Sequence, residues 1–217
     1  MIEIRYTLLS DGSSDRALLP ILDWLLKQYV ESCNIWPQWA DLARLRNPPK
    51  SLTDRITQAV DLYPCNLLFV HRDAERESYE KRRAEIDYAI RQLPDRQTLP
   101  PYVCVVPVRM LEAWLLLDEH SIRSAAGNPR GRDTLDLPRL QDVEQFEDPK
   151  AVLFAALKKA SGLRGGRRAR FKAHARVQRI PQLIQDFSPL RTLEAFGQLD
   201  KQIREFAKTT SAAAKPL

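Results

Sequence analysis

Short apolar runs alternate with segments of helical periodicity over the first 122 residues of the chain. Runs rich in β-branched and aromatic residues predict strands at 2–10, 66–71 and 102–108, with a less regular one around 38–42. Apolar residues spaced three and four apart predict helices at 14–32, 51–63, 78–93 and 109–122. Strands that alternate with helices favour a parallel sheet covered by helices on both faces, so the expected fold class is α/β.

The second half of the chain has a different pattern, with a loop-like sequence at 127–150 and helical segments after it. The clearest helix spans 148–162, where Asp148 suits the N-cap, Pro149 the first position and Gly162 the end. Further helices are predicted at 177–187 and 190–208. We therefore expect an α/β domain at 1–122, a mostly helical, basic C-terminal extension packed on it at 123–207, and a disordered tail at 208–217.

Polar side chains follow three of the predicted strands, at the point where each strand ends. Ligands of open α/β sheets bind outside the carboxyl ends of the strands, so side chains from separate segments are expected to converge there. Asp73 and Glu75 are two residues apart in an extended segment, and both side chains can face the same rim. The candidate residues at this rim are Asp11, Asp15, His71, Asp73, Glu75, Arg109 and Glu112.

Several carboxylates at one rim of the sheet can bind a divalent cation. They raise one another's pKa unless a cation joins them. Hard divalent cations such as Mg²⁺ take oxygen ligands, and two such ions can activate water and stabilise a leaving oxygen in phosphodiester cleavage. The pattern therefore favours metal-dependent chemistry on phosphodiesters.

Structural roles remain open for the same residues. Asp11 can close a turn, and Asp15 can cap the helix that follows. Asp73, Glu75 and Glu112 can be first-turn acids that interact with the positive end of a helix. A histidine at the end of an apolar strand is more often packed than a ligand, and the arginine can form an ordinary ion pair instead of holding phosphate.

The 217-residue chain carries a net charge of +6, and the distribution of this charge narrows the choice of partner. Residues 149–185 contain ten Lys and Arg and no Asp or Glu, whereas the rest of the chain is net negative. This segment favours a polyanion such as nucleic acid, although a solvated loop between helices would have the same composition. Phe171 lies within it and can stack on a base. The candidate ligands of nucleic-acid phosphates here are Arg164, Arg167, Arg168, Arg170, Lys172 and Arg176.

The remaining composition argues against several classes of protein. Three cysteines lie far apart without a CxxC pair, so a disulfide framework is not expected and a reducing cytoplasm fits. The N-terminus does not resemble a signal peptide, and no apolar stretch approaches the roughly 20 residues that span a bilayer. The glycine fingerprints of phosphate loops and dinucleotide sites are absent, as is the nucleophile elbow of serine hydrolases.

The order of these motifs resembles the Toprim domain of topoisomerases, primases, recombination proteins and overcoming-lysogenization-defect (OLD) nucleases. The stretches "LLSDGSSDRALLPIL", "LLFVHRDAE" and "VPVRMLEAWLLLD" are similar, more narrowly, to the bacterial Toprim-like family called domain of unknown function 4276. The similarity covers about residues 1–120. It implies a Toprim-like (flavodoxin-like), mostly parallel sheet flanked by helices, to which the helical C-terminal extension is added.

The resemblance also implies a Mg²⁺ site held by Asp11, Asp73 and Glu75. Asp15 matches a further acid of the first motif, and Glu112 matches the glutamate of an E-x-W-L motif in the narrower family. Asp11 stands where the family usually has Glu, and Glu75 where it usually has Asp. Because Mg²⁺ demands near-ideal octahedral geometry, the two exchanges either compensate for each other or remove the metal.

The expected function is a Toprim-like nuclease, or a related phosphodiester-processing enzyme, that depends on Mg²⁺ or Mn²⁺ and acts on nucleic acid. Its expected catalytic residues are Asp11, Asp73, Glu75 and Glu112, its metal ligands are Asp11, Asp15, Asp73 and Glu75, and Arg109 is expected to hold phosphate. The alternative is a non-catalytic module of the same fold that binds nucleic acid or a partner protein, with homodimerisation also open.

Overall fold

Four parallel strands form one open sheet, in the order β2-β1-β3-β4. They are β1 (Ile2–Leu9), β2 (Cys33–Trp39), β3 (Leu67–His71) and β4 (Tyr102–Val105). This computed structural model describes residues 2–95 and 97–213. The strand order is that of a doubly wound, flavodoxin-like sheet, in which the order reverses between β1 and β3. The expected α/β class with a parallel sheet is confirmed.

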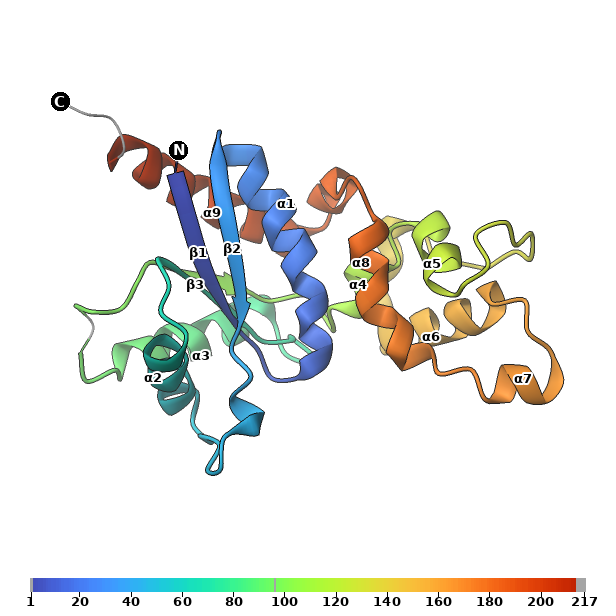
Figure 1. Cartoon of the computed structure of the whole chain (residues 1–217), viewed down its shortest axis with the longest axis horizontal. Helices are drawn as coiled ribbons and strands as arrows, with labels where there is room; N and C mark the ends of the chain where they lie inside the picture. Colours follow the sequence, from blue (N-terminus) through green and yellow to red (C-terminus); the bar gives the residue numbers. More distant parts are fainter. Residues whose placement is uncertain (1, 96, 214–217) are drawn as a thin grey trace.

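Helices cover both faces of the sheet, as the alternating pattern predicted (Figure 1). One face packs against α1 (Leu19–Tyr29) and α9 (Glu194–Ala213), and the other packs against α2 (Leu52–Leu62) and α3 (Tyr79–Arg91). β3 lies between two strands and two helical layers, so all five of its residues are buried. Its continuous apolar run is the pattern expected of a strand that is covered on both faces.

A helical lobe, residues 112–193, extends from the sheet domain on the side of α1 (Figure 1). Its helices and 3-10 turns are α4 (Glu112–Leu115), α5 (Glu119–Ala125), η3 (Leu140–Gln145), α6 (Pro149–Ala160), α7 (Gly165–Ala169), η4 (Ala173–Arg179), α8 (Ile180–Leu183) and η5 (Ser188–Thr192). One continuous apolar core joins the lobe to the sheet. Trp114 of α4, for example, meets Phe196 of α9 edge to face, with 5.2 Å between the ring centroids.

Several predicted ends of helices agree with the structure. Asp148 caps α6 by accepting a hydrogen bond from the Ala151 amide at 2.8 Å, and Pro149 occupies the first helical position. Ser161 is the C-cap, and Gly162 follows it with a φ of +65°. The left-handed backbone after the cap explains why glycine stands there.

Other predicted boundaries are wrong. The strand expected around 38–42 lies at 33–39 and is followed by η2 (Leu42–Arg44). β2 is an edge strand with one neighbour, so it is only partly buried, has a weak apolar pattern and tolerates Pro37. The helix expected at 109–122 is divided into α4 and α5, because Asp118 accepts hydrogen bonds from the amides of His120 and Ser121 and starts a new helix.

Predicted boundaries in the C-terminal half of the chain also differ from the structure. The helix expected at 177–187 is the 3-10 turn η4 followed by the short helix α8. Residues 208–213 were expected in a disordered tail, but they continue α9, and residues 214–217 lie outside the described residues. Within the described ranges, no helix is long and apolar enough to cross a membrane.

The edge of the sheet at β4 is closed by a side chain. Gln202 of α9 accepts a hydrogen bond from the Cys104 amide at 3.1 Å and donates one to the Cys104 carbonyl at 3.2 Å. We expect a Gln202→Ala variant to lose about 1–3 kcal/mol of unfolding free energy, because both backbone groups lose their partner. Urea denaturation measures this loss. A Lys201→Ala variant is the matched control, because Lys201 is exposed on the same helix, and an equal loss in both variants would contradict the prediction.

Candidate functional site

Four ionisable side chains meet at the carboxyl ends of β1 and β3, where the strand order reverses. We call Asp15, His71, Asp73 and Glu112 the acid cluster. His71 lies between two carboxylates, with its Nε2 atom 3.5 Å from Asp73 Oδ1 and 3.8 Å from Asp15 Oδ2. Asp15, His71 and Glu112 are all buried, which is unusual for ionisable groups that are not held in a specific arrangement.

Backbone amides orient two of the carboxylates of the acid cluster. Asp15 lies in η1 (Ser13–Leu18) and accepts a hydrogen bond from the amide of Gly12 at 2.9 Å, so Gly12 and not Asp15 is the N-cap, and Asp15 supports it from the first turn. Asp73 accepts from the Leu111 amide at 3.0 Å, which ties the segment after β3 to the segment before α4. These contacts leave little freedom for the carboxylates to move apart.

The tautomer of His71 follows from its backbone partner. Its Nδ1 atom lies 3.0 Å from the Val105 carbonyl oxygen. A carbonyl oxygen only accepts hydrogen bonds, so Nδ1 carries a hydrogen and donates it. The Nε2 atom is left to face the carboxylates of Asp15 and Asp73, where it can accept a proton or share one with them.

Asp73 has the most perturbed carboxyl of the cluster. Its pKa is raised from the usual 3.8 to about 6, mainly by burial and also by the nearby carboxylates of Asp15 and Glu112, while His71 and the Leu111 amide oppose the shift. A carboxyl with a pKa near 6 binds and releases protons close to neutral pH. Strongly perturbed ionisable groups with specific charged neighbours are enriched at functional sites.

Lys150 connects the helical lobe to the acid cluster. Its Nζ atom is 3.4 Å from Glu112 Oε1, and the lysine side chain remains about half exposed. This lysine lies in the first turn of α6, far along the chain from the strands that carry the acids. The composition marks segment 149–185 as basic, but no local pattern distinguishes Lys150 from the other cations in it.

Two acids predicted for the metal site are not part of the cluster. Asp11 forms ion pairs with Arg55 and Arg72, and Glu75 forms one with Arg82 at 3.2 Å. A chain of ion pairs connects the two acids: Arg72 contacts Glu85 at 3.1 Å, and Arg82 contacts Glu85 at 2.9 Å. Asp11 and Glu75 are thus paired with arginines, and among the described residues neither belongs to a group of three acids, histidines or cysteines that alone could hold a metal ion.

Backbone conformation explains why Glu75 points away. Glu75 and Arg109 both have left-handed backbones, with φ values of 55° and 61°, which non-glycine residues seldom adopt. They are held by two hydrogen bonds: the Glu75 amide donates to the Arg109 carbonyl at 2.8 Å, and the Arg109 guanidinium donates to the Glu75 carbonyl at 3.3 Å. The Glu75 side chain is 65% exposed as a result. Arg109 contacts this backbone turn and no carboxylate of the acid cluster.

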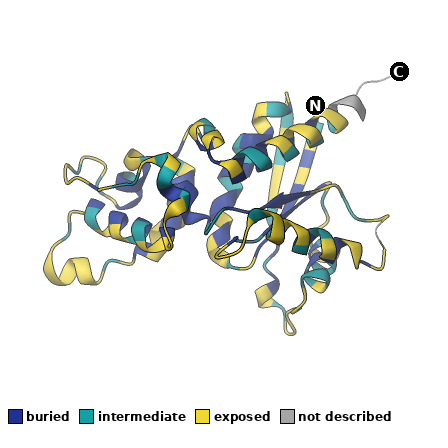
Figure 2. Ribbon diagram, turned by 180° about the vertical axis from the view of Figure 1, so that it is seen from behind, coloured by how far each residue is buried: buried dark blue, intermediate teal, exposed yellow. Residues whose placement is uncertain are grey.

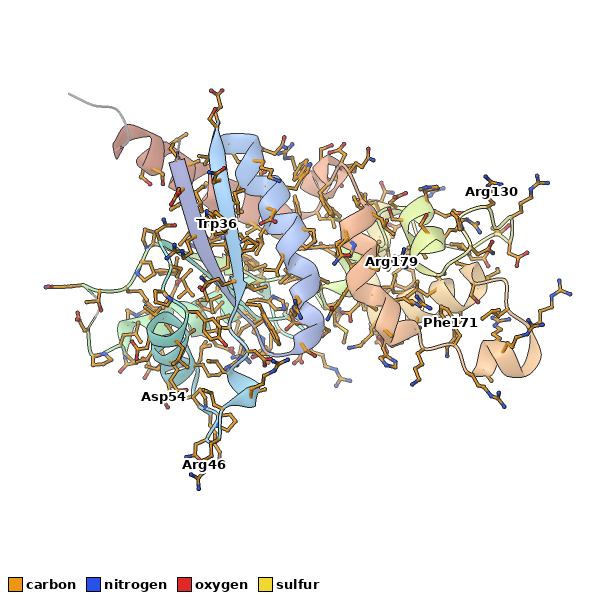
Figure 3. The ribbon with its side chains drawn as sticks, viewed as in Figure 1. Trp36, Arg46, Asp54, Arg130, Phe171 and Arg179 are labelled. Atoms are coloured by element: carbon orange, nitrogen blue, oxygen red, sulfur yellow. The ribbon has the colours of Figure 1, made fainter. Side chains whose placement is uncertain are left out.

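The predicted basic residues lie in the outer part of the helical lobe. α7 and the adjoining loops are exposed, and Phe171 lies beside them (Figures 2 and 3). Most of these cations line a surface pocket of about 480 Å³ together with Phe171. The residues in this region are Arg164, Arg167, Arg168, Arg170, Lys172 and Arg176.

The donor set fits a hydrated cation better than a closed metal cage. Among the described residues, no three His, Cys, Asp or Glu side chains are grouped so that they alone could hold a metal ion. Mg²⁺ usually keeps several waters and takes one or two carboxylates, so a cage is not required. The oxygens of Asp73, with those of Asp15 or Glu112, have the appropriate chemistry, and the mutual effect of these carboxylates on the pKa of Asp73 is the kind that a bound cation would offset.

Comparison of the chain with protein-family models, curated proteins and solved structures finds no match. The Toprim resemblance therefore remains a prediction that rests on the quoted motifs.

Proposed function

We propose that this protein is a Toprim-like, Mg²⁺- or Mn²⁺-dependent enzyme that processes phosphodiester bonds of nucleic acid. The main support is the convergence of Asp15, His71, Asp73 and Glu112 at the reversal point of a parallel sheet, the usual ligand position in this architecture. Asp73 is the central residue, because both other acids of the cluster influence its pKa.

The acid cluster supplies the oxygen ligands in this proposal. Asp73 would hold the cation together with Asp15 or Glu112, and the bound cation would supply charge neutralisation for a phosphodiester and its leaving oxygen. Asp11 and Glu75, which the family pattern assigns to the metal, instead fix the surrounding loops through their ion pairs with Arg72 and Arg82.

The other residues of the site bind phosphate and carry protons. The carboxyl of Asp73, whose pKa is raised to about 6, can take up and release a proton near neutral pH, and the Nε2 atom of His71 lies 3.5 Å from it. Lys150 is half exposed beside Glu112 and can contact a substrate phosphate. The basic surface around α7 would bind the polyanion away from the acid cluster.

A non-catalytic interaction module is the second candidate function. The observation that favours it is the neutralisation of Asp11 and Glu75 by arginines, since two residues of the family's metal set are then unavailable. In this case the acid cluster would have a structural role, and the basic surface would bind nucleic acid without cleaving it.

Metal titration and plasmid nicking distinguish the two functions. We expect wild-type protein to bind Mg²⁺ or Mn²⁺ by calorimetry and to nick supercoiled plasmid DNA, and an Asp73→Asn variant to lose both activities. Asparagine keeps an oxygen that can accept from the Leu111 amide, so the loss would reflect the missing charge. Absence of metal binding by the wild-type protein at millimolar concentrations would favour the interaction module.

Four further variants test which acids form the site. Asp15→Asn and Glu112→Gln are expected to reduce nicking strongly, whereas Asp11→Asn and Glu75→Gln are expected to reduce it less. The opposite ranking would favour the family's metal set over the acid cluster. Glu80→Gln is the matched control, because Glu80 is an exposed acid on α3 that lies outside both sets.

A further inference from the structure

Seven cations without an acidic partner follow one another across both parts of the protein. Among the described residues, no carboxylate lies within ion-pair distance of them, although many other lysines and arginines of the chain are paired. We call them the cationic band. They are Arg167 from α7, Arg170 and Lys172 from the segment between α7 and η4, Arg176 and Arg179 from η4, Arg16 from η1, and Lys50 before α2.

The outer end of the cationic band carries an aromatic ring. Half-buried Phe171 lines the pocket of about 480 Å³ beside α7, together with Arg167, Arg170, Lys172 and Arg176. The guanidinium carbon of Arg176 lies over the Phe171 ring, 6.0 Å from its centroid. Nucleic-acid bases stack on aromatic rings and on guanidinium planes, so this pocket offers a stacking surface surrounded by phosphate ligands.

The inner end also combines an aromatic ring with cations. Trp39 lines a second pocket of about 330 Å³ at the carboxyl ends of β1 and β2 with Lys50 and Arg55, and the carboxylates of Asp11 and Asp41 line the same pocket. The guanidinium carbon of Arg16 lies 5.4 Å from the centroid of the Trp39 ring, and the indole donates a hydrogen bond to Ser10 at 3.0 Å. The tryptophan is therefore held in a fixed orientation beside the loop that leads to the acid cluster.

A direct contact joins the two halves of the cationic band. Gln178 of η4 donates a hydrogen bond to the Ser13 carbonyl at 2.8 Å, which holds the helical lobe against the loop after β1. Arg179 follows Gln178, and Figure 3 shows Arg179 nearer to α1 than Phe171 is. In Figure 1, α7, the segment before α8, the start of α1 and the segment after β2 follow one another along the lower side of the molecule. η4, whose residues line the outer pocket, thus contacts η1, and Arg16 of η1 lies against the Trp39 ring of the inner pocket.

We propose that the cationic band binds single-stranded nucleic acid, with one base at Phe171, another near Trp39 and the backbone along the cations between them. Unpaired bases expose the faces that stacking needs, whereas a duplex hides them, and this favours a single strand. This proposal rests on the proposed function in one respect: the reason for binding would be to bring the strand to the acid cluster. Binding itself requires neither metal nor cleavage.

The number of groups in the cationic band sets a minimum length for the strand. A dinucleotide has two bases and one internal phosphate, so it cannot occupy both rings and also the cations between them. Tight binding therefore needs a longer oligonucleotide.

Fluorescence anisotropy with labelled DNA tests the proposal. The Asp73→Asn protein without added metal is the starting point, so cleavage does not interfere with binding. We expect a single strand of about 20 nucleotides to bind more tightly than a dinucleotide or a duplex of the same sequence. Trp39→Ala and Phe171→Ala are each expected to weaken binding about tenfold, as for the loss of one stacked base.

Matched controls separate stacking from general effects. Trp36→Ala removes an exposed tryptophan of the same strand as Trp39, outside the cationic band, and should leave binding unchanged. An Arg167→Ala/Arg170→Ala double variant should lower the slope of log affinity against log salt by about 1.4, at about 0.7 per phosphate contact. An Arg91→Ala variant on α3 should not change it.

The outcomes are distinguishable from those of the nicking experiment. Tighter binding of the duplex, or equal weakening in Trp36→Ala and Trp39→Ala, would overturn the single-strand assignment even if the protein nicks plasmid. Binding with the expected pattern and no nicking would support the cationic band and contradict the catalytic proposal.

Discussion

Replacement of Trp114 by alanine is expected to cost about 3–5 kcal/mol of unfolding free energy, as for other large aromatic residues removed from a core. Trp114 is fully buried and lies edge to face against Phe196, so the variant would leave a cavity between α4 and α9. The total stability of a domain is about 5–15 kcal/mol, and the loss would therefore be a large part of it.

Chemical denaturation followed by circular dichroism measures this loss, and a milder variant guards against complete unfolding. Trp114→Phe should cost less than Trp114→Ala, because phenylalanine keeps part of the contact with Phe196. Trp36→Ala is the control, since Trp36 is 56% exposed and its removal should change stability by at most about 0.5 kcal/mol. A cost below 1 kcal/mol, on the order of a surface substitution, would contradict the packing of α4 against α9.

Asp73→Asn is expected to stabilise the fold above pH 6 by about 2–3 kcal/mol when no divalent cation is present. The unfolded carboxyl titrates near 3.8, whereas the pKa of Asp73 in the folded protein is about 6. The Asp73 carboxyl therefore holds its proton more tightly in the folded state than in the unfolded state. Its contribution to stability is fully present below pH 3.8 and is lost as the pH rises through 6. Asparagine has no charge to bury and removes this dependence.

Thermal unfolding between pH 4 and pH 8 in the presence of a chelator tests the sign of this effect. The difference between wild type and Asp73→Asn should grow in favour of the variant as the pH rises from about 4 to 7. Asp61→Asn, which replaces an exposed carboxyl on α2, should follow the wild-type curve. A variant that is less stable than wild type at pH 8 would show that interactions of the Asp73 carboxylate outweigh its burial.

The position of the helical lobe gives the acid cluster its surroundings. Lys150 contacts Glu112, and Gln178 holds the loop that begins with Asp11 and ends with Asp15. Both come from segments that lie far from the strands in the sequence. The lobe thus brings positive charge to an acidic rim, and this combination is one reason for proposing a polyanionic substrate.

The sequence by itself determined the parallel α/β sheet and the rim at which its acids gather. Apolar runs alternate with helical periodicity because buried strands and amphipathic helices need those patterns, and the carboxyl ends of parallel strands share one edge. Asp15, Asp73 and Glu112 could be placed near one another on that basis alone. The weak pattern of the edge strand β2 misled the prediction, because one neighbour and partial exposure put little constraint on its residues.

Only the tertiary structure decided which of the acids meet. Asp11 and Glu75 are turned toward arginines of α2 and α3, and Glu75 has a left-handed backbone that no local pattern predicts. Lys150 reaches Glu112 only because the helical lobe folds back on the sheet. The physical reason is that periodicity records which residues are buried, whereas the direction of a loop side chain depends on partners that are distant in the sequence.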